Sequence, residues 1–280
     1  MAKECTKAYC TPNDSDRPRK EAVTTMAFDE QAAIDRFWEA RRSGDYFPTD
    51  WYDRLTVDQA FRIQLGVAAR REAMGERRVG WKIGLTSDAA QRQFGLREPV
   101  FGYLVDGGLT RSGHVFGRDE LISPAFEVEV CVRLCEPLSG TVDAAQARRA
   151  VDLCYPALEV VEIRGDLATQ FALAMADNAQ QKAFVLGEPV PLGDIDLRGV
   201  ETRVAVNGEG VARGHGEAVG GDPLNSVIWL ARKLGEYGLS LRAGDLIMTG
   251  SFTRQFPLAP GDHVRAEFDG LGTIEAGVAA

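Results

Sequence analysis

Histidine is scarce in this 280-residue chain, which contains three, and none lies near another in the sequence. Isolated histidines argue against a histidine-rich zinc site and against a catalytic triad. The five cysteines form no C-x-x-C pair and their number is odd, so the pattern is not that of a disulfide framework. We therefore expect reduced thiols and a cytoplasmic protein.

Long apolar runs and an excess of basic charge are also missing. No run is long enough to span a bilayer and the N-terminal residues are polar, so we expect neither a membrane partner nor a signal peptide. The net charge of −9 argues against nucleic acid as a partner, because nucleic acid rewards clustered lysine and arginine. An acidic chain that binds a small anion generally needs a local cation, which lends some support to a metal.

Periodicity divides the chain into two parts. Residues 1–27 are polar and aperiodic, which is typical of a flexible N-terminal tail. From residue 28 a helical spacing of apolar residues begins, and the 45% hydrophobic and 26% charged content is that of an ordinary globular chain. The length suffices for a full core, so we expect residues 28–280 to form a single domain.

Strict alternation marks residues 123–134, SPAFEVEVCVRL, as a strand that carries two carboxylates on one face. Glu127 and Glu129 are separated by about 6.5–7 Å along such a strand, close enough for both to reach one hard cation. Without a cation they would mostly repel each other. Alternating strands of this kind are commonly half-exposed, with a solvated charged face, so the pair needs outside support.

A second short strand is predicted at residues 157–163, ALEVVEI. Its two carboxylates, Glu159 and Glu162, are three residues apart and therefore point to opposite faces, so at most one of them joins the first pair. Three carboxylates from two strands would give an anionic oxygen site. Such a site suits Mg²⁺ or Mn²⁺ rather than zinc.

Two further polar residues lie in apolar surroundings. Gln64 belongs to the inner face of a helix predicted from the Thr-x-x-Gln capping box at residue 56 to about residue 74, where it is either satisfied by the backbone or part of a binding site. Lys82 is the centre of a strand at residues 79–85, between two glycines that often mark close approach of a backbone or ligand. It is either an edge-strand lysine or a lysine held near a metal-bound anion.

The remaining elements do not alternate regularly between strand and helix, which disfavours a doubly wound fold. Residues 96–122 contain turn clusters, and Asn207-Gly208 indicates a hairpin. No phosphate-binding glycine motif is present. Helices are expected at 28–44, 86–95, 141–151, 167–179 and 222–237, and strands at 182–186, 245–249, 263–268 and 272–277.

A set of segments spread over the chain carries a family resemblance. In order they are GWKIGLTS, PVFGYL, FEVEV, PALEVVEIRG, ADNA, GDPLNSVIWLARKL, GDLIMTGSFTR and APGD. Together they resemble the 2-keto-4-pentenoate (2-hydroxypentadienoate) hydratase and 4-oxalocrotonate decarboxylase family of the fumarylacetoacetate hydrolase superfamily, over roughly residues 35–278. The GSFTR segment is most similar to the branch acting on 2-oxohept-3-ene-1,7-dioate.

The resemblance implies an α+β fold in which a mixed sheet is rolled into a barrel-like form, preceded by a helical segment. It implies a divalent metal, Mg²⁺ or Mn²⁺, a small 2-oxo or 2-hydroxy acid as substrate, and a homo-oligomer, with a complex with another pathway enzyme as an alternative. The family's metal carboxylates correspond to Glu127, Glu129 and Glu159, its active-site lysine to Lys82, and its substrate-binding positions to Gln64, Asn178, Gly250 and Ser251.

Two departures from the family pattern concern the reaction. Many hydratases of the family carry an aspartate where this chain has Val100, whereas the decarboxylases tend to be apolar there. The frequent His-Pro of the family is Asp222-Pro223 here, so no catalytic histidine is expected. The resemblance favours a metal-dependent hydratase (a hydro-lyase) of meta-cleavage aromatic degradation. The alternatives are the decarboxylase of the same pathway and a non-catalytic partner of such an enzyme pair.

Overall fold

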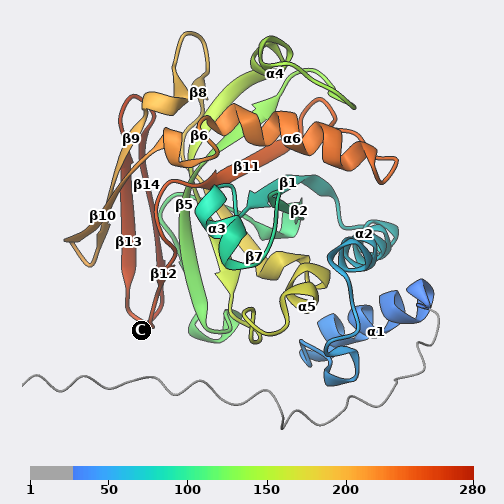
Figure 1. Ribbon diagram of the computed structural model, residues 1–280. Coiled ribbons are helices and arrows are strands. Elements are labelled where there is room, and N and C mark those ends of the chain that lie inside the picture. Colours follow the sequence, from blue (N-terminus) through green and yellow to red (C-terminus); the bar gives the residue numbers. More distant parts are fainter. Residues whose placement is uncertain (1–27) are drawn as a thin grey trace, which may run out of the picture.

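Helices and strands are interleaved along the chain without regular alternation (Figure 1). The structure, a computed structural model, describes residues 28–280; the predicted tail, residues 1–27, lies outside the described residues. The α-helices are α1 (Glu30–Ser43), α2 (Val57–Ala73), α3 (Asp88–Gln93), α4 (Ala144–Ala150), α5 (Phe171–Ala176) and α6 (Pro223–Gly235). Short 3₁₀ turns are η2 (Thr49–Trp51), η3 (Asp106–Gly108), η4 (Arg118–Glu120), η5 (Asn178–Gln180), η6 (Leu197–Gly199) and η7 (Gly216–Ala218).

The strands form two mixed sheets. They are β1 (Arg78–Gly84), β2 (Val100–Val105), β3 (Leu109–Arg111), β4 (His114–Phe116), β5 (Pro124–Leu134), β6 (Val151–Glu162), β7 (Gln181–Leu186), β8 (Val190–Pro191), β9 (Glu201–Val206), β10 (Glu209–His215), β11 (Leu246–Ser251), β12 (Phe256–Pro257), β13 (His263–Phe268) and β14 (Gly272–Val278). The nine-stranded sheet has the order β2-β1-β11-β5-β6-β7-β3, with β12 on β5 and β8 on β6. The five-stranded sheet has the order β10-β9-β13-β14-β4.

Parallel and antiparallel pairs occur in both sheets. The pairs β1–β11, β3–β7 and β14–β4 are parallel, and the other pairs are antiparallel. Helix α2 packs against both α1 and α5, while α6 lies against β11 and α4 (Figure 1). These features confirm the predicted α+β class. Within residues 28–280, no helix has both the length and the apolar character needed to cross a membrane.

The Asn178 side chain links β2, at one edge of the larger sheet, to the start of β7, near the other edge. Strands β2 and β7 are five places apart in the strand order, which would separate them by roughly 20 Å or more in a flat sheet. Yet the Asn178 amide, just before β7, accepts from Tyr103 N at 2.8 Å and donates to Tyr103 O at 3.0 Å in β2. The sheet is therefore strongly curved. No backbone ladder joins β2 to β7 within residues 28–280, so the barrel-like form stays a prediction.

Several local predictions are confirmed by the hydrogen bonds that end or begin elements. The predicted capping box at the start of α2 is present, with Thr56 and Gln59 each accepting from the backbone of the other. Helix α6 begins at Pro223, and the Asp222 side chain caps it. The β9–β10 hairpin turns at Asn207-Gly208, both with positive φ, as a two-residue hairpin turn requires.

Other elements differ from the prediction. Residues 96–122 were expected to hold turns, but they also contain strands β2, β3 and β4. Helix α4 is capped by Asp143 rather than Thr141, because Asp143 and Gln146 form a capping box. The helix expected at 167–179 is shorter and ends at Ala176, because the backbone turns left-handed two residues later.

Candidate active site

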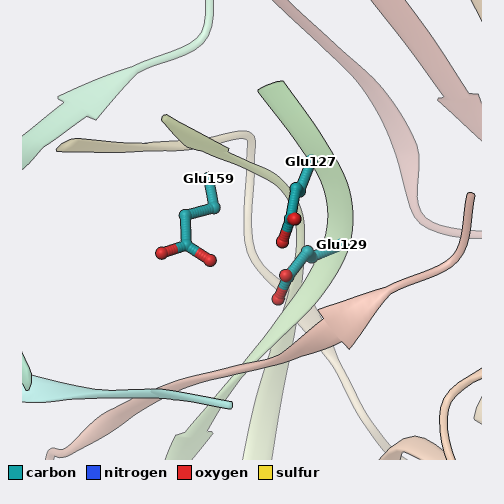
Figure 2. Close-up of side chains that lie close together, drawn as sticks. All are labelled: Glu127, Glu129 and Glu159. Carbon is teal, nitrogen blue, oxygen red and sulfur yellow. The ribbon is translucent and has the colours of Figure 1, made fainter. Parts of the chain in front are cut away.

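Three carboxylates converge from two neighbouring strands, as Figure 2 shows. Glu127 and Glu129 project from β5, and Glu159 projects from β6 toward them. Each offers an oxygen atom, and these atoms all lie within 4.8 Å of one another. Strand alternation explains the convergence, because Glu127 and Glu159 are direct partners across the β5–β6 ladder and Glu129 is two residues further along the same face.

The cluster is buried and poor in hydrogen-bond donors. Glu129 and Glu159 are 0% exposed, which rules out the solvated charged face that alternation alone allowed. Gly250 N donates to Glu129 Oε2 at 2.9 Å. The other oxygen of Glu129 and both oxygens of Glu159 accept no hydrogen bond from the described residues. Buried polar atoms are normally paired, so these orphaned oxygens indicate a missing positively charged or donor group.

Lys82 supplies one positive charge to the cluster. Its Nζ lies 3.1 Å from Glu159 Oε1, an ion-pair contact whose angles are not those of a hydrogen bond, and it donates to Ala179 O at 3.3 Å. Strand β1 lies between β2 and β11 and the Lys82 side chain is 5% exposed, so the edge-lysine alternative is wrong. Three carboxylates and one ammonium leave two negative charges, which a divalent cation would balance.

The spacing of the oxygens also fits a small divalent ion. Oxygens on opposite sides of Mg²⁺ are about 4.2 Å apart and those around Ca²⁺ about 4.6–5.2 Å, given the usual metal–oxygen distances. The oxygen atoms of Glu127, Glu129 and Glu159 lie within 4.8 Å of one another, so a single ion of this kind can reach all three carboxylates. An all-oxygen, all-carboxylate donor set favours Mg²⁺, Mn²⁺ or Ca²⁺ over zinc.

Burial controls the protonation of these groups. It raises the pKa of Glu159 to about 7, although Lys82 acts in the opposite direction. Burial also raises the pKa of Glu129 well above its usual range, and the neighbouring charges of Glu159 and Glu127 add to that effect. For Lys82, burial lowers the pKa but the carboxylates raise it more, so the net shift is upward. Lys82 therefore remains an ammonium ion and a hydrogen-bond donor.

Gly102 makes room for the lysine. Lys82 and Gly102 are partners in the β1–β2 ladder, and a Cβ at Gly102 would lie 3.0 Å from Lys82 Cε. Val100 and the end of the Lys82 side chain both lie near Gly84, because a Cβ there would be 3.4 Å from Val100 Cγ2 and 3.9 Å from Lys82 Nζ. Sequence reasoning did not single out Gly102; the signal was a glycine inside the apolar run VFGYLV.

The acceptor of the lysine is held by an unusual backbone turn. Asn178, Ala179 and Gln180 have φ values of 55°, 47° and 60°, in the left-handed region that residues with a side chain rarely adopt. This turn directs Ala179 O toward Lys82 and the Asn178 amide toward β2. Gln64 Nε2 completes the network by donating to Phe101 O and Asn178 Oδ1, both at 3.2 Å. Strained backbone of this kind concentrates at functional sites.

Gly250 and Ser251 lie at an irregularity of β11. The β11–β5 register shifts between Met248 and Ser251, and Gly250 has a φ of 119°. This conformation turns Gly250 N toward Glu129, while Ser251 Oγ contacts the backbone N and O of Val128 at 3.3 and 3.4 Å.

The predicted residues therefore divide into two groups. Lys82, the three carboxylates and Gly250 N form one cluster: Lys82 pairs with Glu159, Gly250 N donates to Glu129, and the carboxylate oxygens lie within 4.8 Å of one another. The side chains of Gln64, Asn178 and Ser251 bond mainly to backbone next to this cluster, although Gln64 Oε1 is buried without a donor among the described residues. Their role in substrate binding stays a prediction.

Known proteins are similar to this chain in fold and in sequence. Residues 109–279 match the family Fumarylacetoacetate (FAA) hydrolase C-terminal. The chain is 36% identical to 4-oxalocrotonate decarboxylase of Pseudomonas sp. (strain CF600), covering 81% of this chain and 88% of that protein. It is 35% identical to 2-keto-4-pentenoate hydratase of Paraburkholderia xenovorans (strain LB400), covering 87% and 93%.

A solved structure extends the match to three dimensions. 4-Oxalocrotonate decarboxylase from Pseudomonas putida G7, complexed with magnesium and adipate, superposes with a TM-score of 0.84 at 33% identity, over 89% of this chain and 97% of that chain. The predicted resemblance is confirmed. The chain belongs to the 2-keto-4-pentenoate hydratase and 4-oxalocrotonate decarboxylase family, within the fumarylacetoacetate hydrolase superfamily.

Proposed function

We propose that this protein is a metal-dependent hydratase that adds water to a 2-hydroxy-dienoate or 2-oxo-enoate of meta-cleavage aromatic degradation, of the 2-hydroxypenta-2,4-dienoate or 2-oxohept-3-ene-1,7-dioate type. One observation carries the proposal: two buried carboxylates, a third that is half-buried and one lysine leave two formal negative charges uncompensated at a single point. Glu127, Glu129 and Glu159 would hold Mg²⁺ or Mn²⁺. A structural relative is described with magnesium, which supports this choice of ion.

The rest of the assignment follows from the family. Curated relatives include 2-keto-4-pentenoate hydratases and a 2-hydroxyhexa-2,4-dienoate hydratase, which act on small organic acids by name. Residues 28–280 would form one catalytic domain around a barrel-like roll of the larger sheet, and the enzyme would be a homo-oligomer. Gln64, Asn178, Gly250 and Ser251 would border the substrate.

The chemistry that the site must support is the build-up of negative charge on the C2 oxygen of a 2-oxo acid. A bound divalent cation supplies Lewis-acid stabilisation of that charge. Lys82 keeps its proton and directs its ammonium group at the same region, where it would donate to the substrate carboxylate or C2 oxygen. Burial excludes bulk water, which strengthens this interaction. Water is then added at the distal carbon of the enone.

A decarboxylase is the second candidate, and Val100 is the observation that favours it. The side chain is apolar and 3% exposed, and it lies near Gly84, as does the end of Lys82, at a position where many hydratases of the family have a carboxylate. A decarboxylase would use the same stabilised charge and lose CO₂ instead of adding water. A non-catalytic partner is disfavoured, because Lys82 and all three carboxylates are present.

Turnover on two substrates separates these candidates. The purified protein is incubated with Mg²⁺, or after EDTA, with 2-hydroxypenta-2,4-dienoate and separately with 4-oxalocrotonate, and the products are followed by NMR. Metal-dependent formation of 4-hydroxy-2-oxopentanoate establishes the hydratase. Release of CO₂ from 4-oxalocrotonate alone establishes the decarboxylase. If the protein converts neither compound but does convert a longer dienedioate, its substrate is of the heptenedioate type. Full activity after complete metal removal contradicts the proposal.

A further inference from the structure

A second polar cavity lies apart from the carboxylate cluster. It has a volume of about 250 Å³ and is lined by residues of α1, α2, β2 and the start of β7. Lys82 and the three clustered carboxylates are not among its lining residues. The acid that β6 contributes to it is Glu162, which points to the opposite face of the strand from Glu159. The cavity is therefore separate from the proposed metal site.

The acidic groups of this cavity already have partners. Glu162 accepts from Arg164 Nη1 at 2.8 Å and from a backbone N–H at 3.0 Å. Asp177 accepts from Arg164 Nε, and Glu76 accepts from Arg71 Nε at 2.9 and 3.0 Å. A cation in the cavity would have to compete with these arginines. The lining acids therefore do not make it a metal site.

Donors, in contrast, remain unmatched in the cavity. Arg41, from the last turn of α1, donates to no acceptor in the part of the chain that the structure describes. Gln181 is 7% exposed, and its Nε2 has no hydrogen-bond partner among residues 28–280. Lys182 also lines the cavity, but its ammonium group is already paired with Glu162 at 3.4 Å. Unpaired donors and positive charge in a half-enclosed space favour an anionic acceptor.

The volume of the cavity and its apolar walls indicate which class of ligand it binds. Pockets for drug-sized ligands have volumes of about 300–1,000 Å³, so 250 Å³ suits a smaller molecule. Phe37, Val67 and the ring of Tyr103 give the cavity apolar walls beside the donors. We propose that this cavity binds a small organic carboxylate, whose carboxylate group accepts from Arg41 and Gln181 and whose carbon skeleton packs on these walls. Binding here does not require the metal, although Asn178 lines this cavity and also belongs to the hydrogen-bond network next to Lys82.

Metal-free protein provides the test, because it removes binding that depends on a metal at the carboxylate cluster. Succinate, acetate and sulfate are titrated into the full-length, EDTA-treated protein at constant ionic strength, with calorimetry and ligand-observed NMR as readouts. Succinate or acetate is expected to bind saturably, and Arg41→Gln to raise the dissociation constant at least tenfold. Arg36→Gln is the matched control on the same helix. The Arg36 side chain pairs with Asp45 and Asp50 instead of lining the cavity. The dissociation constant of Arg36→Gln should therefore stay within twofold of the wild-type value.

Two further variants keep the test decisive. Gly107 lines the cavity, and a Cβ there would meet no atom within 4 Å, so Gly107→Leu should obstruct the cavity without disturbing the fold and weaken binding at least tenfold. Lys82→Met, which removes the ammonium group from the carboxylate cluster, should bind the carboxylates as wild type does. The proposal is overturned by the absence of saturable carboxylate binding, by binding of sulfate alone, or by unchanged binding in a folded Arg41→Gln or Gly107→Leu protein. Loss of binding in Lys82→Met would assign the ligand to the other site and also overturn it.

Discussion

Glu127 and Glu159 lie directly opposite each other in the β5–β6 ladder, two like charges at a cross-strand position. Such pairs are destabilising by about 0.2–1 kcal/mol even in exposed sheets, and burial adds to the effect. Glu127→Gln should therefore stabilise the metal-free protein while weakening Mn²⁺ binding at least tenfold. Urea unfolding in EDTA measures the first effect, and Mn²⁺ titration followed by electron paramagnetic resonance measures the second.

The control for this variant is Glu162→Gln, on the same strand but the opposite face. Glu162 is paired with Arg164 and Lys182, so its neutralisation should destabilise the protein and leave Mn²⁺ binding unchanged. Equal Mn²⁺ affinity in wild type and Glu127→Gln would show that this carboxylate is not a metal ligand.

Removal of the Lys82 ammonium should separate metal binding from turnover. In Lys82→Met the repulsion between the ammonium and a bound cation disappears, so Mn²⁺ should bind at least as tightly as in wild type. The value of kcat/KM should fall about 10²–10³-fold, the usual effect of losing one preorganised donor at a developing charge. Steady-state kinetics and Mn²⁺ titration on the same preparation check both outcomes. Full turnover in Lys82→Met contradicts the assigned role.

An added methyl group at Gly102 should disturb the lysine indirectly. A Cβ there would come within 3.0 Å of Lys82 Cε and of Asn178 Oδ1, so one of these groups has to move. Gly102→Ala is expected to lower kcat at least tenfold while Mn²⁺ binding remains. Gly210→Ala is the matched control, because a Cβ at that strand position meets nothing within 4 Å. Equal kcat in the two variants would mean that turnover does not require the space left by the missing side chain of Gly102.

A surface cluster around Glu98 predicts a specific pH dependence of stability. Glu98 accepts from Lys233 at 2.8 Å and from Trp229 Nε1 at 3.3 Å. Burial raises its pKa, but Lys233 and Trp229 lower it more, so the folded-state pKa is below its usual value of 4.5. The stabilisation is therefore present above about pH 4.5 and is lost as the pH falls through the lower, folded-state pKa.

Glu98→Gln measures this contribution. Urea unfolding should show a loss of about 0.5–1 kcal/mol at pH 7, because the pair is partly exposed and screened by solvent, and a smaller loss at pH 3.5. Trp229 fluorescence should change over the same interval. The control is Glu188→Gln, an exposed carboxylate with no ion pair in the described chain. A difference between wild type and Glu98→Gln that is constant with pH would contradict the assignment.

Local pattern was sufficient to predict part of the site. The alternation of side chains along a strand predicted that Glu127 and Glu129 share one face, and the structure has them on one face. The choice of Glu159 over Glu162 needed the family resemblance, because strand parity separates the two but does not say which face holds the pair. The structure brings Glu159 to the pair and turns Glu162 toward the other cavity.

Other features depend on contacts that no local pattern records. Every residue of Val100–Val105 is buried, so β2 lacks the alternation that identifies a half-exposed strand, and the turn clusters around it dominated the prediction. The left-handed turn at 178–180 contains no glycine and follows a helix-forming segment, and of its three residues only Asn178 is of a type that often adopts positive φ. Tertiary hydrogen bonds from Lys82, Tyr103 and Gln64 hold that turn.

The left-handed turn has a consequence for the order of folding. Lys82 donates to a carbonyl that is 97 residues away in sequence, and Tyr103 bonds to an amide 75 residues away. Strand β1, which carries Lys82, also pairs with β11 over a still longer separation, Gly80 with Leu246. Contacts of such sequence separation contribute only after a long loop has closed, which slows folding. The site is therefore expected to form together with the sheet, and activity should return on refolding only when the whole fold is complete.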